Sequence, residues 1–411
     1  MSTATRRAPR KKRTLPVINL NIDIPLLVIV VVLIVLGLLM VYSASWDFSL
    51  VNYDDATQMF RRQLFTLTVG IGACIVTSFI DYRYWRKYAV PLMFLMVVGL
   101  LGVLILGEVR YNSQRALSAG SYMPGEIAKV VTIMYLSVWL HAKRNELKQV
   151  GMGILPLGLM LGIIAGLILL QPDLSAAATI VMLGGIMFFL AGGDLKQIAY
   201  MLGGGALAGW LVVSVSATGR ARMGAFLQAW QNPTQADYHV LRSFEAFVKG
   251  GWFGVGIGQA DTKLTGLPVP PTDSIFAVIG EELGIVGAFF VVALFALLLW
   301  RSLVIAKRAP DMLGSLLAAG IGLWIVLEAF INMAVIVSLL PFAGNALPFI
   351  SYGGSSLVAT LTAIGILMNV ARVSNREEGR RERTLDATAR GRRGKRGWGV
   401  SRARRAARVG R

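Results

Sequence analysis

The sequence has few charged residues for its length. Only 15% of the 411 residues are charged, whereas 55% are hydrophobic and the mean hydropathy is +0.63. A soluble globular domain carries about 25% charged residues, so this composition excludes one. Apolar runs of about 20 residues recur along the chain, and a helix of that length crosses a bilayer. We therefore expect an integral membrane protein.

Cysteine and histidine are almost absent. The single cysteine, Cys74, falls within an apolar run, so no intrachain disulfide can form. The only histidines are His141 and His239, and no Gly-x-Ser-x-Gly or His-Glu-x-x-His motif occurs, which argues against a serine hydrolase or a zinc protease. No metal site is predicted. The glycine-rich run 250–258 superficially resembles a dinucleotide fingerprint, but it lacks the strand–turn–helix context, so a tight turn or re-entrant segment is the preferred interpretation.

The apolar runs predict an all-α, polytopic membrane protein with about ten transmembrane helices. Lys and Arg concentrate in alternate loops, which places both termini in the cytoplasm. The first run is too long for a cleavable signal peptide and is read as a retained span. The expected helices are 25–42, 64–80, 89–107, 125–141, 153–170, 174–192, 198–216, 275–300, 313–336 and 356–371.

The net charge of +19 divides unevenly along the chain. A basic N-tail (1–23) and a basic C-tail (372–411) flank the membrane domain (24–371), and together the tails hold 21 Lys and Arg against 5 Asp and Glu. The C-tail lacks large apolar residues, so we expect disorder and binding to anionic lipid or a cytoplasmic protein, with no nucleic acid.

A long extracytoplasmic loop, at about 217–274, carries five basic residues on the side where positive charge is normally scarce. Long translocated segments largely escape this bias, which is one explanation. The other is that the loop meets an anionic ligand. The five residues are Arg220, Arg222, Arg242, Lys249 and Lys263.

Asp273 closes this loop, directly after a proline-rich approach. A helix N-cap would explain such a residue, and the alternative is a general base held at the membrane surface. Glu281 and Glu282 then enter the next span, where an uncompensated charge is costly, so at least one should face a polar cavity or a cation.

Three further polar groups lie at outer edges of spans. Glu126 and Lys129 are three residues apart and share a helical face, where a local ion pair is the simpler explanation. Gln171 and Asp173 interrupt two apolar helices. The run 347–356 places hydroxyl side chains and glycines between spans. This composition suits exposure of backbone N–H groups to an anion, and the alternative is an ordinary loop. Its candidate residues are Ser351, Tyr352, Gly353, Gly354 and Ser355.

Four motifs in order resemble the SEDS family (shape, elongation, division and sporulation). They are Gln171-Pro-Asp-Leu174, Gly250-Gly-Trp-Phe-Gly-Val-Gly-Ile-Gly258, Thr272-Asp-Ser-Ile-Phe-Ala-Val-Ile-Gly-Glu-Glu-Leu-Gly284 and Leu347-Pro-Phe-Ile-Ser-Tyr-Gly-Gly-Ser-Ser356. The resemblance covers nearly everything between the tails. It implies a peptidoglycan glycosyltransferase that polymerises lipid II on the outer face of the bacterial cytoplasmic membrane, with a class B penicillin-binding protein as transpeptidase partner.

The resemblance assigns the family's essential aspartate to Asp273 and its paired polar residues to Glu126 and Lys129. This chain departs from the family pattern with Pro271 and Ser274 around Asp273, and with Arg115-Ala116 where the family usually has Arg-Trp. Lys263 and the Phe349-Ile350 form of the last motif look more like the division branch, FtsW, than the elongation branch, RodA. The resemblance therefore implies a role at the division septum together with other divisome proteins.

The expected reaction is an inverting glycosyl transfer from a polyprenyl-diphosphate-linked disaccharide-peptide. Asp273 would deprotonate the acceptor hydroxyl, and cations would offset the diphosphate charge. The cations are Arg220, Arg222, Lys129 and Lys263, with Arg115, Glu126, Gln171, Asp173, Glu282 and the 351–355 group as further substrate contacts. No cofactor is indicated, although a divalent cation such as Mg²⁺ stays open. The alternatives are a RodA-like elongation polymerase, a flippase or transporter of lipid-linked precursors, and a non-catalytic scaffold.

Overall fold

The computed structural model describes residues 22–106, 108–110, 113–116, 124–171, 173–232 and 236–406; residues 106, 108–110, 113–116, 218 and 382–406 are described by backbone alone. The regular secondary structure of the described chain is helical apart from one hairpin, in which β1 (Glu108–Arg110) pairs antiparallel with β2 (Ser113–Ala116). The expected all-α class is therefore confirmed. The N-tail up to residue 21 lies outside the described residues.

The regular structure of the described chain consists mainly of α-helices. A short 3-10 turn, η1 (Tyr82–Tyr84), links the second and third. The α-helices are α1 (Ile24–Tyr53), α2 (Gln58–Phe79), α3 (Trp85–Leu106), α4 (Pro124–Lys143), α5 (Ile154–Leu170), α6 (Leu174–Leu190), α7 (Leu195–Val215), α8 (Ala217–Gln231), α9 (Tyr238–Gly250), α10 (Ile275–Glu282), α11 (Gly284–Arg308), α12 (Met312–Ile336) and α13 (Gly354–Ala406).

Aspartate side chains start many of these helices. In each case the carboxylate accepts a hydrogen bond from a backbone N–H of the first turn, where the helix leaves such donors unpaired. The aspartate caps are Asp23 of α1, Asp173 of α6, Asp194 of α7, Asp237 of α9 and Asp311 of α12. Asp23 also forms an ion pair with Arg301 of α11 at 2.7 Å and is buried, so it fastens the start of α1 to α11.

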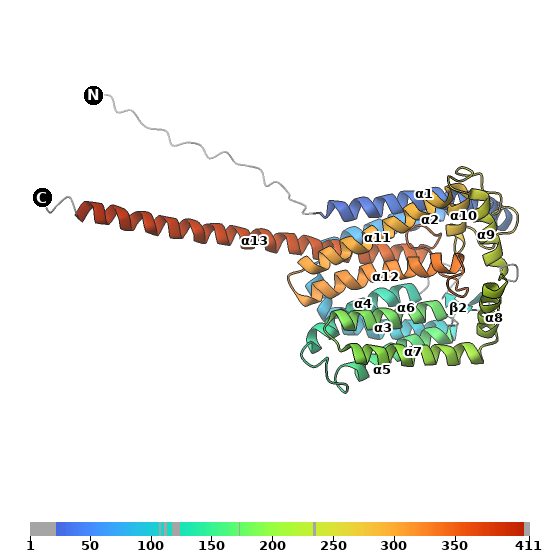
Figure 1. The fold of residues 1–411 in the computed structure, drawn as a ribbon, viewed down its shortest axis with the longest axis horizontal. Coiled ribbons are helices and arrows are strands. Elements are labelled where there is room, and N and C mark those ends of the chain that lie inside the picture. Colours follow the sequence, from blue (N-terminus) through green and yellow to red (C-terminus); the bar gives the residue numbers. More distant parts are fainter. Residues whose placement is uncertain are drawn as a thin grey trace, which may run out of the picture.

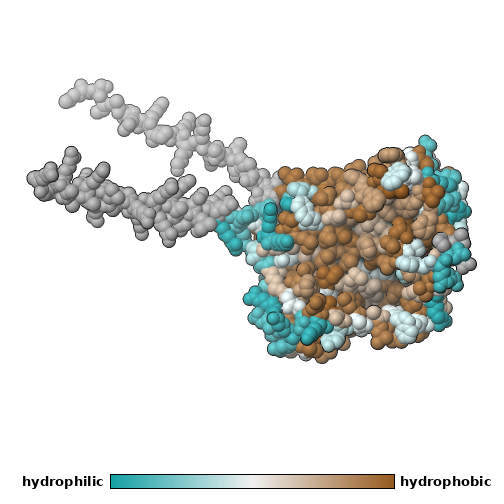
Figure 2. All heavy atoms as spheres, in the orientation of Figure 1, coloured by the Kyte–Doolittle hydropathy of each residue, from teal (hydrophilic) through white to brown (hydrophobic). Residues whose placement is uncertain are grey.

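The two ends of the bundle differ. Figure 1 shows that α1 begins and α13 leaves at one end, whereas α8, α9 and α10 lie at the other. In the described chain, seven helices are long and apolar enough to cross a membrane, and α5 and α6 are shorter apolar helices. The face drawn in Figure 2 is apolar across its middle and hydrophilic at both ends. The protein is therefore a multi-pass membrane protein.

Helices occur outside the expected spans as well. The outer loop at about 217–274 contains two helices, α8 and α9. Beyond the expected span 356–371, α13 runs on to Ala406. The expected span 275–300 is broken into α10 and α11.

The break occurs at Gly284, which has φ of +69°. A left-handed residue ends α10, and only glycine adopts it without steric cost. The glycine-rich run 250–258 packs on this junction: Ile285 N–H donates to Gly251 O at 2.9 Å, and Gly256 N–H donates to Glu282 O at 3.0 Å. A Cβ at Gly254 would overlap the Glu282 backbone. The run is therefore a tight structural turn, as its sequence context suggested.

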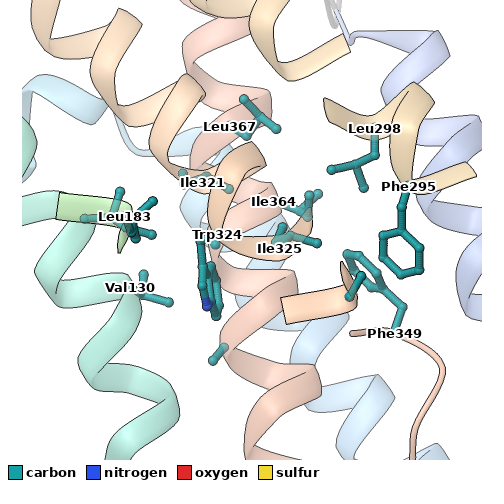
Figure 3. Packing of buried hydrophobic residues seen from close by; sticks show 14 of the residues in the cluster. Val130, Leu183, Phe295, Leu298, Ile321, Trp324, Ile325, Phe349, Ile364 and Leu367 are labelled. Atoms are coloured by element: carbon teal, nitrogen blue, oxygen red, sulfur yellow. The ribbon is translucent and has the colours of Figure 1, made fainter. Parts of the chain in front are cut away.

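Helix α12 lies at the centre of the packing. Its apolar stretch is 78% buried inside the protein, compared with 6% for α7. Trp324 is fully buried among side chains such as Val130 of α4, Leu183 of α6 and Ile364 of α13 (Figure 3). Polar side chains on α12 are therefore surrounded by protein, and burying them is costly unless another protein group pairs with them.

Candidate active site

Asp273 lies in the turn that leads into α10. This helix takes Ser274 as its N-cap, and the Ser274 hydroxyl donates to Pro268 O at 2.7 Å. Asp273 immediately precedes this cap residue. Its side chain is half-buried, and it lies against Gly344 in the segment between α12 and α13. A Cβ at Gly344 would come within 2.7 Å of Asp273 Oδ2, so glycine leaves room for the carboxylate.

The segment before α13 lies directly against the Asp273 turn. Tyr352 N–H donates to Pro271 O at 2.8 Å, and the Ser351 hydroxyl donates to Thr272 O at 2.7 Å. The Ser351 oxygen also accepts from Leu347 N–H at 2.7 Å. The structure thus brings together Asp273 and the 347–356 motif, which are 74 or more residues apart in the sequence.

Gln63 of α2 fixes the other side of this motif. Its side chain donates to Ser351 O at 3.3 Å and accepts from Gly353 N–H at 3.4 Å. The N–H groups of Tyr352 and Gly353 are therefore used inside the protein. Binding of an anion by the N–H groups of this motif stays a prediction. Gly354 begins α13 against Thr66, and Ser355 lies in the first turn of that helix.

Lys129 lies between two carboxylates. Its ammonium forms an ion pair with Glu126, one turn away at 2.9 Å, and a second with Glu328 of α12. The Lys129 and Glu328 side chains are each 2% exposed. Among the described residues, Glu126 Oε2 is buried without a hydrogen-bond partner. The expected local pair exists, but the cluster contains a further carboxylate and carries a formal charge of −1 when all three groups are ionised.

Asparagine side chains connect this cluster to Asp273. Asn345 donates to Glu328 O at 3.2 Å, and Asn332 donates to Asn345 O at 2.6 Å and to Asp273 O at 2.9 Å. Glu328 and Asn332 are four residues apart on α12, so they share one face of that helix. A polar path therefore runs from α4 through α12 to the backbone of Asp273.

Lys263 and Glu282 form a buried ion pair. The Lys263 ammonium lies 2.8 Å from Glu282 Oε1 and donates to the Ser43 hydroxyl of α1 at 2.9 Å. Glu282 therefore faces a cation, as its place in a span predicted. Glu281 accepts hydrogen bonds from Asp261 N–H at 2.9 Å and from the Thr262 side chain. Both glutamates fasten the outer loop, so the structure gives Lys263 an internal partner instead of an open position.

The arginines of α8 differ in their surroundings. Arg220 is exposed and donates to Ser214 O at 2.7 Å. Arg222 lies over the Phe342 ring, 5.5 Å from its centroid, and the His239 ring stacks on Phe342 at 4.2 Å. His239 Nδ1 is 3.5 Å from the Ser274 hydroxyl, so this stack reaches the residue next to Asp273. Burial and, to a lesser extent, the nearby Arg222 charge lower the pKa of His239, against the opposing effect of Asp237.

Two predicted residues lie in the turn between α5 and α6. The Gln171 amide is buried and donates to Leu100 O of α3 at 3.0 Å. Asp173 caps α6 and accepts from the Ser175 hydroxyl at 2.9 Å. These contacts hold the turn in place. Arg115 lies on β2, and its side chain is outside the described part of the chain.

The sequence analysis did not identify several of these residues. Glu328 and Asn332 had a readable signal, because two polar residues four apart in an apolar run mark one helical face. His239, Phe342 and Asn345 had no such signal, since their roles depend on contacts between distant segments.

The carboxylates of the site do not assemble a metal centre within the described ranges. No group of three or more His, Cys, Asp or Glu side chains there could hold a metal ion. Glu126 and Glu328 are the nearest paired carboxylates, and Lys129 already neutralises part of their charge.

The chain is similar to curated bacterial proteins over most of its length. It is 40% identical over 356 residues to a probable peptidoglycan glycosyltransferase FtsW of Trichlorobacter lovleyi, covering 85% of this chain and 93% of that protein. It is 36% identical over 360 residues to the stage V sporulation protein E of Bacillus subtilis, covering 86% and 97%.

The fold is similar to solved structures. One, described as "Structural coordination of polymerization and crosslinking by a peptidoglycan synthase complex", matches with a TM-score of 0.71 and 25% identity over 86% of this chain and 98% of that chain. The rod shape determining protein RodA of Thermus thermophilus matches with a TM-score of 0.63 and 24% identity, over 85% and 97%. A model of the FtsW, RodA and SpoVE cell cycle proteins matches residues 24–376, and the chain therefore belongs to this family.

Proposed function

We propose that this protein is a peptidoglycan glycosyltransferase that polymerises lipid II into glycan strands at the outer face of the bacterial cytoplasmic membrane. Curated relatives with 36–40% identity carry the name of this enzyme. The observation that carries the proposal is the position of Asp273. Its half-buried carboxylate lies at the end of the bundle that carries α8 and α9, in a turn fixed by hydrogen bonds from α12 and from the segment before α13.

The reaction joins an acceptor hydroxyl to the anomeric carbon of a donor sugar while the lipid diphosphate departs. Asp273 accepts the proton of the attacking GlcNAc 4-hydroxyl, and attack opposite the departing diphosphate inverts the anomeric configuration. The leaving diphosphate gains negative charge, so nearby cations stabilise the transition state. Arg222 and the exposed Arg220 on α8 are suited to this role, and Arg222 borders a hollow that Phe226, Val240 and Phe342 also line.

Lys129 and Lys263 serve a different purpose in this proposal. Each ammonium is buried and already paired, Lys129 with Glu126 and Glu328, and Lys263 with Glu282. A diphosphate would have to displace a buried carboxylate to reach either one, which is costly. These lysines therefore fix the helices and the loop around Asp273, and direct charge stabilisation belongs to the arginines of α8.

The distribution of charge favours an enzyme over a transporter. A transporter places its polar binding groups near the bilayer midplane, at the interface of two repeats. Here Glu126 and Lys129 lie in the first two turns of α4, and Glu281 and Glu282 lie just before the α10–α11 break. The charged groups around Asp273 thus gather toward one end of the bundle.

The proposal includes a location and partners. We place the protein at the division septum, since several relatives are named FtsW. The alternation of Lys and Arg between loops supports cytoplasmic termini, ten membrane passes and an outside position for Asp273. A similar solved chain belongs to a peptidoglycan synthase complex, which supports a cognate class B penicillin-binding protein as partner, together with other divisome proteins. The basic C-tail binds anionic lipid at the inner surface, each Lys or Arg contributing about 1 kcal/mol.

Substitution of Asp273 tests the base assignment. Asp273→Asn keeps the size of the side chain and removes the base, so polymerisation of lipid II by protein reconstituted with its partner should fall by about 10²–10⁴-fold. Asp261→Asn is the matched control, because Asp261 lies in the same loop, exposed and paired with Lys249 at 3.0 Å. The control should keep activity within about threefold. Retention of most activity by Asp273→Asn would show that another group is the base.

A further inference from the structure

The segment that carries Asp273 has few hydrogen-bond donors of its own. Pro268, Pro270 and Pro271 lack a backbone N–H, so the turn presents carbonyl oxygens that its own residues cannot all satisfy. Buried carbonyl groups without a partner are rare in folded proteins, because each costs free energy comparable to a lost hydrogen bond. The donors must therefore come from other parts of the chain.

Three consecutive carbonyls of the turn each accept from a different outside donor. Pro271 O accepts from Tyr352 N–H at 2.8 Å, Thr272 O from the Ser351 hydroxyl at 2.7 Å, and Asp273 O from the Asn332 amide at 2.9 Å. Two of these three donors are side chains. The three carbonyls fix the direction of three successive peptide planes, and the Asp273 carboxylate projects from the last of them.

Both interlocked segments contain a strained residue. Val269 has φ of +44° and Phe349 has φ of +65°, in a region that β-branched and bulky residues rarely adopt. Each lies two residues before one of the hydrogen-bonded residues, Pro271 and Ser351. Such a conformation persists only where the surrounding contacts determine it. The contacts between the two segments are therefore strong enough to hold an unfavourable backbone.

We propose that Asn332 and Ser351 are positioning residues for the Asp273 base, which rests on the proposed function of Asp273. In this proposal the Ser-Tyr-Gly-Gly motif fixes the backbone of the turn that carries Asp273. Its Tyr352 and Gly353 N–H groups do not bind the substrate phosphate. Asn332 also connects the Asp273 turn to the Lys129 cluster, because it donates to Asn345 O, and Asn345 in turn donates to Glu328 O. Rotation of the carboxylate away from the attacking hydroxyl would slow the chemical step without weakening substrate binding.

Two variants remove the side-chain donors separately. Asn332→Leu has nearly the same shape and loses both amide donations, and Ser351→Ala loses the hydroxyl. Ser351→Thr retains a hydroxyl and should rescue. The matched control is Asn369→Leu: Asn369 is 2% exposed, like Asn332, and bridges Ser78 O and Tyr82 N–H, each at 2.8 Å, at the opposite end of the bundle.

The first measurement is amide hydrogen exchange of the peptide 268–276 in the full-length chain. Exchange in Asn332→Leu and Ser351→Ala should be at least tenfold faster than in the wild type, and in Ser351→Thr and Asn369→Leu it should be unchanged. This readout needs no activity, so it tests the hold on the turn even if the protein fails to polymerise lipid II. Unchanged exchange in both donor variants would overturn the inference.

The second measurement is the kinetics of lipid II polymerisation with the partner present. Asn332→Leu and Ser351→Ala should lower kcat by about 10–100-fold and change KM by less than about threefold. Asn369→Leu should keep kcat per folded molecule. If the donor variants kept wild-type kcat, or if Asn369→Leu lost as much, the positioning role would be wrong while the proposed function stood. A wild type without polymerase activity would overturn the proposed function instead.

Discussion

Removal of the Lys129 charge should destabilise the protein more than removal of either partner's charge. Lys129 and Glu328 are each 2% exposed and Glu126 is 18% exposed, so the cluster is shielded from water. Lys129→Met keeps most of the side-chain length and leaves two carboxylates facing each other without a cation. Breaking a buried ion pair by removing one partner costs about 3–5 kcal/mol, and here one change breaks two pairs.

Glu328→Gln is the informative comparison. It keeps the shape of the side chain and leaves Lys129 paired with Glu126 at 2.9 Å. We expect a loss of about 1.5–3 kcal/mol, the contribution of a hydrogen bond to a charged group. The double variant Lys129→Met/Glu328→Gln leaves one carboxylate, so its loss should fall short of the sum of the single losses by about 1–3 kcal/mol.

The assay is unfolding of the purified protein in mixed micelles, titrated with a denaturing detergent, for the wild type, both single variants and the double variant. The four free energies of unfolding form a double-mutant cycle. The reasoning would be refuted if Lys129→Met cost no more than Glu328→Gln, or if the two losses simply added. Either result would mean that the ammonium does not hold the two carboxylates together.

Three further predictions concern the loop, a helix crossing and pH. Lys263→Met leaves Glu282 buried without its cation and should cost about 3–5 kcal/mol, measured by the same unfolding titration, with faster proteolysis of the outer loop. Gly365→Ala should lower the thermal midpoint and cost about 1–3 kcal/mol of stability, because a Cβ there would overlap the Cys74 backbone and push α13 away from α2. Gly162→Ala is the control: its Cβ would meet nothing within 4 Å, so it should stabilise the protein by about 0.5–1 kcal/mol. The pKa of His239 is lowered in the folded state, so the unfolded state binds protons more readily. Stability is therefore retained above about pH 6.5 and falls as the pH drops toward the folded pKa. The difference between the thermal midpoints at pH 7.5 and 5.5 should be smaller in His239→Gln than in the wild type.

Most spans follow from local sequence features. The expected span 313–336 matches α12 (312–336), and the expected span 174–192 matches α6 (174–190). Both agreements arise because an apolar run of bilayer length must satisfy its backbone hydrogen bonds internally, as a helix does. The break at Gly284 was missed, since an isolated glycine within an apolar run gives no sign of a positive φ.

The candidate site was found in part. Asp273, Lys129 and Glu282 stood out because charges next to apolar runs are costly and hence few. Their partners did not stand out equally. Glu328 pairs with Lys129 across 199 positions, and Ser43 contacts Lys263 across 220, so no local pattern could connect them. The contacts of the Ser351 motif with the Asp273 turn were not anticipated for the same reason.

The sequence by itself determined that this is a multi-pass helical membrane protein and that Asp273 stands at the edge of a span, because hydropathy and helical periodicity are properties of neighbouring residues. Only the tertiary structure decided which polar groups meet. Asn332 and Ser351 reach the Asp273 turn across 59 and 79 positions. Such contacts depend on how each helix is rotated and packed, which the physics of a single segment does not fix.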